Sequence, residues 1–231
     1  MSGSLVSPET RAKVRSLMTP IALGLGRLGL TPNALTVIGF AIACVAAVLA
    51  GAQLWLPAGL LVVFGGVFDL FDGALARATN KASRLGAFMD SVFDRWGEGV
   101  VYVGIVWGTL DLGLWRPIVL AAAAMASAFM VSYTRAKAES LGFEPGSGMA
   151  NVGLAPREVR ILILTLGLIG AGIVGTGIDT SSCTTCAGGA AYPLGALVLE
   201  LALGLIALLA TITTIQRIVH TINQAHAQEQ G

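Results

Sequence analysis

The feature that most constrains this chain is a succession of long apolar segments, each close to the length that a helix needs to cross a bilayer. The first begins after Thr31 and Pro32, a pair typical of a helix start, and runs from about Ala34 to Ala52. Five more follow, at about Leu56 to Thr79, Leu85 to Leu110, Leu114 to Ser140, Pro156 to Gly175 and Pro193 to Ile222. With 55% hydrophobic and 12% charged residues and a mean hydropathy of +0.79, the chain is too apolar for an ordinary soluble domain. We therefore predict an all-α membrane protein with six transmembrane helices.

A weaker helical pattern precedes these segments. Ser7 and Pro8 predict a helix start, and apolar residues then recur three and four positions apart while basic residues lie mostly off that stripe. This pattern favours an amphipathic helix on the membrane surface at residues 7–30, and a solvated basic tail is the alternative. No cleavable signal peptide is expected. The prediction is a single domain over residues 1–231, with the six-helix bundle at residues 32–222.

The distribution of positive charge predicts the orientation of the bundle. If the N-terminus is cytoplasmic, 13 of the 14 Lys and Arg residues fall on the cytoplasmic side and only Arg116 falls outside. Trp55, Trp115 and Tyr192 then lie near the outer ends of the helices, as in an interfacial aromatic belt. We expect a multi-pass protein of the cell membrane with both termini in the cytoplasm.

Four aspartates lie in apolar surroundings between Phe68 and Gly99: Asp69, Asp72, Asp90 and Asp94. Carboxylates are costly there unless a counter-charge neutralises them. Helical spacing of about 100° per residue places the first two on one helix face and the last two on one face of the next helix. Small residues share these faces: Gly73 and Ala76 on the first, Gly86 and Gly97 on the second. Because a short turn joins the two helices, they run antiparallel and the four carboxylates can converge.

Such a cluster predicts a metal site that faces the cytoplasm. All-oxygen ligation suits a hard cation, Mg²⁺ or Mn²⁺, and two ions would clamp both sides of a phosphoryl displacement. Arg77, Lys81 and Arg84 lie at the cytoplasmic mouth, where a polyanion would enter. A structural network, in which the aspartates pair with these basic residues, is the alternative.

The string Asp69-x2-Asp72-Gly73-x2-Ala76-Arg77-x8-Gly86-x3-Asp90-x3-Asp94 resembles, without a departure, the signature of the CDP-alcohol phosphotransferase family. The resemblance implies transfer of a substituted phosphate from a CDP-linked lipid to an alcohol, release of CMP, and a homodimer. It also implies metal binding by Asp69, Asp72, Asp90 and Asp94, with Asp94 as the candidate catalytic base. Nucleotide contact is implied for Asp69, Asp72, Gly73, Ala76, Arg77 and Gly86. Asn33 would line the same nucleotide site, although helix capping alone explains its segment.

The acceptor alcohol must be inferred from a second group of residues. Five cations fall at the cytoplasmic ends of the last three helices: Arg135, Lys137, Arg157, Arg160 and Arg217. As a set they suit the phosphate of a phosphorylated acceptor, and ordinary positive-inside anchoring is the alternative reading. The segments SYTRAKAES and PREVRILIL resemble those of phosphatidylinositol phosphate synthases and their archaeal counterparts, which implies CDP-diacylglycerol as donor and inositol 1-phosphate as acceptor. Glycerol 3-phosphate, used by a phosphatidylglycerophosphate synthase, fits the same cations.

Several readings stay open. A cation or proton transporter would also carry intramembrane acids, but it gives no reason for the small-residue faces or for Arg77. Glu98 is either a partner of the aspartate site or the ion-pair partner of Arg95 or another cytoplasm-side cation. Cys183 and Cys186 favour a local disulfide. No nucleic-acid partner is expected.

Overall fold

The computed structural model describes residues 8–143, 152–175 and 193–229. These residues form seven helices and no strand: α1 (Pro8–Arg27), α2 (Pro32–Gly51), α3 (Trp55–Ala78), α4 (Arg84–Asp111), α5 (Trp115–Ser140), α6 (Arg157–Val174) and α7 (Leu194–Glu229). The all-α prediction is confirmed for these residues. Ser7, Cys183, Cys186 and Tyr192 lie outside the described part of the chain, so the expectations that rest on them are not addressed.

Local sequence explains where two of the helices begin. The Thr31 hydroxyl accepts a hydrogen bond from the Ala34 N–H at 3.2 Å, and Pro32 occupies the first turn of α2. The Ser83 hydroxyl accepts one from the Gly86 N–H at 3.0 Å and so caps α4. The turn that joins α3 to α4 is thereby fixed close to the aspartates on both helices.

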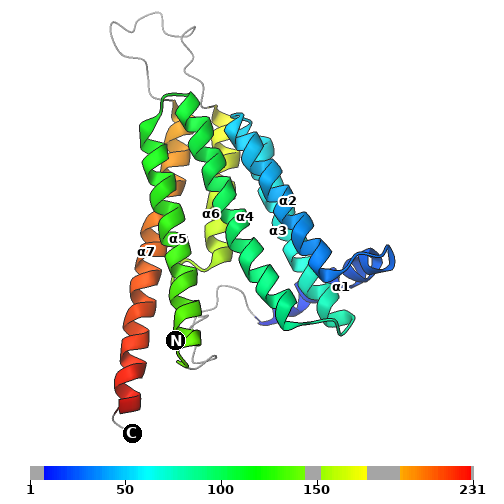
Figure 1. The fold of residues 1–231 in the computed structure, drawn as a ribbon. Helices are drawn as coiled ribbons and strands as arrows, with labels where there is room; N and C mark the ends of the chain where they lie inside the picture. The colour runs from blue at the N-terminus through cyan, green and yellow to red at the C-terminus, as the bar shows by residue number, and fades with distance from the viewer. Residues whose placement is uncertain (1–7, 144–151, 176–192, 230–231) are drawn as a thin grey trace, which may run out of the picture.

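The predicted surface helix at residues 7–30 ends three residues earlier, at Arg27. The predicted bounds of the six later helices agree with the structure to within about two residues, except at the end of the chain. There α7 continues to Glu229 instead of ending near Ile222, because no Gly or Pro interrupts the polar residues that follow. Figure 1 shows this end of α7 extending beyond the other helices. A change from apolar to polar composition was therefore a poor guide to the end of the helix.

Four helices, α2, α3, α5 and α7, are long and apolar enough to cross a membrane. α4 and α6 have the length but carry several charges, among them Asp94 and Glu98 on α4 and Arg157 and Arg160 on α6. The multi-pass character of the chain is thus supported by four helices. Membrane crossing by α4 and α6, and the cytoplasmic position of the termini, stay predictions.

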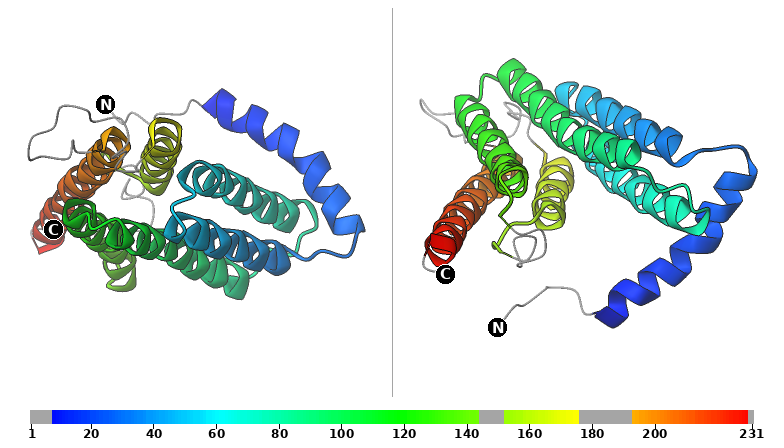
Figure 2. Two further views of the ribbon diagram at one scale, coloured as in Figure 1. Left: turned by 90° about the horizontal axis from the view of Figure 1, so that it is seen from above. Right: turned by 60° about the horizontal axis from the view of Figure 1, so that its bottom comes forward.

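The six long helices form two groups of three. α2 packs against α3 and α4, and α7 packs against α5 and α6; the two groups meet where α3 contacts α6 and α4 contacts α5. We call α2–α4 the first triplet, α5–α7 the second triplet, and the boundary between them the seam. The view from above in Figure 2 shows the two triplets side by side, with α1 lying across the outside of the first.

Small residues bring the helices of each triplet close together. A Cβ at Gly104 of α4 would overlap the Ala47 carbonyl oxygen of α2, so only glycine permits this approach. The main core fills the bundle, and a second, smaller core seats α1 on α3 through Ala22, Phe71 and Leu75. Because the backbones of α2, α3 and α4 are held this closely, the first triplet is a firm support for the carboxylates that it carries.

Candidate active site

Asp69 of α3 and Asp94 of α4 are brought together by one cation from the second triplet. Arg157, in the first turn of α6, places its Nη2 2.8 Å from Asp69 Oδ2 and its Nη1 3.0 Å from Asp94 Oδ2. The side chains of Asp69 and Asp94 are 21% and 13% exposed, so the contact is largely shielded from water. Two carboxylates from neighbouring helices thus share one guanidinium across the seam.

Asp72 lies one turn from Asp69 on α3 and is held by a different partner. Its Oδ2 accepts a hydrogen bond of 2.6 Å from the Thr36 hydroxyl of α2, and both residues are 5% exposed. Asp90 lies one turn before Asp94 on α4 and is half-buried. The predicted pairing of two acidic helix faces is therefore present, with Thr36 as an orienting group that no motif had indicated.

The four carboxylates supply the donor chemistry that a hard divalent cation prefers. In the arrangement described, however, no group of three or more Asp, Glu, His or Cys residues within the described ranges lies close enough together to hold a metal ion. The positive charge that Asp69 and Asp94 require comes instead from Arg157. The donor set fits a metal, and a bound ion would supply the charge that these carboxylates now take from the arginine.

The small residues of the motif leave room beside polar side chains. Gly73 lies under the guanidinium of Arg77: a Cβ there would stand 3.2 Å from its Nη1. A Cβ at Gly86 would stand 3.3 Å from Asn33 Oδ1, so the amide of α2 faces the first turn of α4. Arg77 is exposed and Ala76 is half-buried. Asn33, Arg77 and the two glycines therefore lie at the end of the aspartate site that is near the turn between α3 and α4.

A cavity opens on the apolar side of the same carboxylates. Asp69, Asp94 and Arg157 line it together with Glu98, and its remaining walls come mainly from small and apolar residues such as Gly39, Phe40, Leu61, Gly65 and Phe93. It lies among α2, α3, α4 and α6. The cavity therefore joins a charged end, at the carboxylates and Arg157, to an apolar interior.

The five cations predicted to bind the acceptor fall into three environments. Arg157 contacts the aspartates. Arg160 and Arg217 are buried in the second triplet, at 1% and 5% exposure. Arg135 pairs with Glu139 at 2.8 Å on a half-exposed surface, and Lys137 is exposed. The structure thus brings Arg157 to the carboxylates, buries two of the other cations and leaves two near the surface.

Arg95 was not among the predicted site residues and also lies at the seam. Its Nε donates to the Ser132 hydroxyl of α5 at 3.3 Å, and its Nη1 lies 3.7 Å from Asp94 Oδ2. Glu98, for which the sequence left two readings, pairs with Arg160 rather than with Arg95. A basic residue directly after the last aspartate of the motif was the signal available for Arg95.

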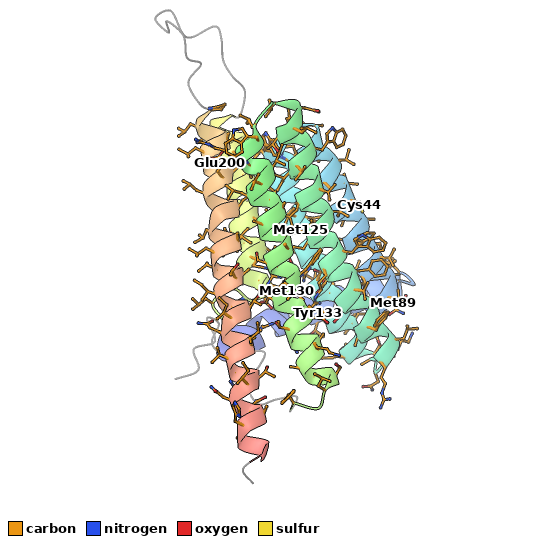
Figure 3. All side chains as sticks on the ribbon, turned by 60° about the vertical axis from the view of Figure 1, so that its left-hand side comes forward. Cys44, Met89, Met125, Met130, Tyr133 and Glu200 are labelled. Carbon is orange, nitrogen blue, oxygen red and sulfur yellow. The ribbon has the colours of Figure 1, made fainter. Side chains whose placement is uncertain are left out.

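Figure 3 labels residues of α4, α5 and α7 along the bundle. Met89 of α4, next to Asp90, and Tyr133 of α5, two residues before Arg135, are both toward the lower end. Glu200 of α7 lies near the opposite end. Met89 and Tyr133 therefore lie toward one end of the bundle and Glu200 toward the other.

The chain is similar to known proteins over most of its length. The model of the CDP-alcohol phosphatidyltransferase family matches residues 29–223. An archaetidylinositol phosphate synthase of Pyrococcus horikoshii is 38% identical over 156 residues, which cover 68% of this chain and 78% of the relative. A phosphatidylinositol phosphate synthase of Cutibacterium acnes is 34% identical over 213 residues, which cover 90% of this chain and 94% of the relative.

Solved structures agree in fold. The crystal structure of the Mycobacterium tuberculosis phosphatidylinositol phosphate synthase with CDP-DAG bound superposes with a TM-score of 0.72 at 27% identity, covering 89% of this chain and 94% of that one. The structure of the same enzyme in complex with manganese and citrate gives a TM-score of 0.69 at 28% identity, covering 89% of this chain and 88% of that one. The whole helical bundle described above is thus shared with these proteins.

Proposed function

The chain belongs to the CDP-alcohol phosphatidyltransferase family, and we propose that within this family it transfers the phosphatidyl group of CDP-diacylglycerol to inositol 1-phosphate. The products are phosphatidylinositol phosphate and CMP. Relatives at 34–38% identity carry the name of phosphatidylinositol phosphate synthase or of its archaetidyl counterpart. The chain is therefore a transferase of phospholipid biosynthesis.

The observation that carries the choice of a phosphorylated acceptor is the position of Arg157. Its guanidinium lies against Asp69 and Asp94, at the place where donor and acceptor must meet. Its Nε is buried and has no hydrogen-bond partner among the described residues. An arginine fork suits the oxygens of a phosphate better than the neutral hydroxyls of inositol alone.

The reaction follows from these positions. The acceptor hydroxyl attacks the phosphorus that bears diacylglycerol; a new O–P bond forms, the P–O bond to CMP breaks, and the hydroxyl proton passes to Asp94. Asp69, Asp72 and Asp90, with Asp94, would hold Mg²⁺ or Mn²⁺, most simply two ions, which supply positive charge for the diphosphate and for departing CMP. Asn33, Gly73, Ala76, Arg77 and Gly86 border the place assigned to the cytidine nucleotide.

The remaining cations complete the acceptor site in this proposal. Arg135 and Lys137 at the end of α5, and Arg217 on α7, add the positive charge that draws an anionic acceptor toward Arg157. Glycerol 3-phosphate, the acceptor of a phosphatidylglycerophosphate synthase, carries the same phosphate. The names of the relatives favour the inositol ester. An active site facing the cytoplasm, a single domain and a homodimer belong to the proposal as well, the first because of the charge distribution.

An assay of CMP release tests the proposal. Purified protein is supplied with CDP-diacylglycerol and Mg²⁺ or Mn²⁺, and with inositol 1-phosphate, glycerol 3-phosphate, inositol or serine in turn. We expect release with inositol 1-phosphate, none after the metal is chelated, and recovery when it is restored. Release with glycerol 3-phosphate alone would change the acceptor, and no release with any acceptor alongside cation flux in liposomes would favour a transporter.

A further inference from the structure

The first turn of α6 is held by a buried ion pair to the first triplet. Arg160 Nε donates to Glu98 Oε1 at 2.9 Å and its Nη2 donates to Glu98 Oε2 at 2.8 Å, while its Nη1 donates to the Ala155 carbonyl oxygen at 3.1 Å. Arg160 is 1% exposed and Glu98 is 3% exposed. Each nitrogen of the guanidinium is bonded within the protein, so Arg160 is poorly placed to bind an acceptor directly.

The segment that leads into α6 is also held from the other side. The Thr213 hydroxyl of α7 accepts hydrogen bonds from the Leu154 N–H at 3.0 Å and the Ala155 N–H at 2.9 Å. Arg217 Nε donates to the Val152 carbonyl oxygen at 3.1 Å. Thr213 and Arg217 of α7, with Arg160 of α6, thus fix the backbone just before Arg157.

Two ion pairs, which we call the inner step and the outer step, link α6 to α4 across the seam. Arg157 and Arg160 are one helical turn apart on α6, and Asp94 and Glu98 are one turn apart on α4. The inner step, Arg160 with Glu98, is buried and bidentate; the outer step, Arg157 with Asp94, is nearer to solvent. A bidentate pair fixes both the distance and the rotation of its two helices. The inner step therefore sets where the outer arginine stands.

We propose that Glu98 and Arg160 are positioning residues that hold Arg157 at the phosphate of the acceptor, an inference that rests on the proposed function and deepens it. Arg160 then acts on the acceptor through Arg157, and Glu98 acts through Arg160. Arg160 does not line the cavity beside Asp69 and Asp94; Glu98 does line it, but both of its carboxylate oxygens are bonded to Arg160. Changes to this ion pair should therefore raise the KM for the acceptor far more than the KM for CDP-diacylglycerol.

Two variants test this role. Glu98→Asp keeps the charge but withdraws the carboxylate by one methylene, and the double variant Glu98→Gln with Arg160→Met removes both charges, so that no unpaired charge stays buried. We expect each to raise the KM for inositol 1-phosphate about tenfold, since a shift of about 1 Å in a binding group has effects of that size or larger. The KM for CDP-diacylglycerol should stay within about twofold of the parent.

The matched control is Asp111→Asn, which removes a carboxylate from the exposed end of α4, about 25 Å along the helix from Asp94. Calorimetric binding of inositol 1-phosphate gives a readout besides activity, and it should weaken in the two test variants and not in the control. Unchanged KM values in folded variants would overturn the inference, and so would an equal rise in both KM values. If the parent uses only glycerol 3-phosphate, inositol 1-phosphate is not the acceptor. The rise in the acceptor KM relative to the rise in the CDP-diacylglycerol KM, measured with glycerol 3-phosphate, then still tests the positioning role.

Discussion

The two triplets of this bundle contribute to the candidate site in opposite ways. The first carries acids at short, regular spacings on two adjacent helices: Asp69 and Asp72 on α3, and Asp90 and Asp94 on α4. The second carries cations drawn from three helices, and among the described residues of these helices Arg157 alone forms ion pairs with the four aspartates. Chemistry common to a family is thus encoded locally, whereas recognition of the acceptor depends on how two groups of helices meet.

The largest expected effect is the loss of the proposed base in the first triplet. Asp94→Asn should lower kcat for CMP release by about 10²- to 10⁴-fold, the usual contribution of a positioned acid or base. Binding of the phosphorylated acceptor, measured by calorimetry, should change far less, because Arg157 keeps Asp69 as a partner. A wild-type kcat in this variant would show that Asp94 is not the catalytic base. It would also weaken the claim that the first triplet supplies the chemistry and the second triplet the acceptor site.

A smaller effect is expected at Thr36, which orients Asp72. Thr36→Val keeps the shape of the side chain and removes the 2.6 Å hydrogen bond to the carboxylate. Groups that orient metal ligands are typically worth about 10- to 100-fold in metal affinity or activity. Titration with Mn²⁺ should show the loss as a higher metal requirement, with the KM for the acceptor unchanged. A change in the acceptor KM instead would mean that Asp72 serves both halves of the site.

In the second triplet, the hydroxyl of Thr213 supports the backbone before α6. Thr213→Val leaves one buried and one part-buried N–H group without their acceptor, which should cost about 1–3 kcal/mol of stability. Thermal unfolding in detergent measures this loss. Thr211→Val is the matched control, because the Thr211 hydroxyl is exposed and bonds only to the Ala207 carbonyl of its own helix in the contacts described. Equal losses in the two variants would show that the segment before α6 is not specially supported.

The smallest effect is expected at the half-exposed pair of Arg135 and Glu139. Glu139→Gln should change stability by less than about 1 kcal/mol, as exposed ion pairs usually do. It also releases Arg135, so the KM for an anionic acceptor should stay level or fall slightly. A marked rise in that KM would show that Glu139 holds Arg135 in a binding position.

The sequence predicted the first triplet well because its information is local. The aspartates lie three or four residues apart, and helical periodicity converts such spacings directly into shared faces. Thr36 and Asp72 are 36 residues apart, and Glu98 and Arg160 are 62 apart. Neither contact follows from any periodicity, because each depends on how helices pack. Arg160 was grouped with the acceptor cations for its charge and its side of the membrane, whereas its environment is that of a buried structural pair.

The helix bounds show the same difference between features that local sequence signals predict and features that they do not. Capping by Thr31 and Ser83 is a local signal, and the helices that follow begin within two residues of their predicted positions. The end of α7 was predicted from where apolar composition ceases. That boundary indicates where a membrane ends, whereas nothing in the residues beyond it stops a helix.

The most direct test of the account is the acceptor preference of Arg157→Gln. The ratio of kcat/KM for inositol 1-phosphate to that for inositol is measured by CMP release in the parent and in the variant, at saturating CDP-diacylglycerol and metal. We expect the ratio to fall about 10- to 100-fold in the variant, the effect of losing charge-assisted hydrogen bonds to one phosphate. An unchanged ratio in a folded, active variant would contradict the claim that the two triplets meet at the acceptor through Arg157.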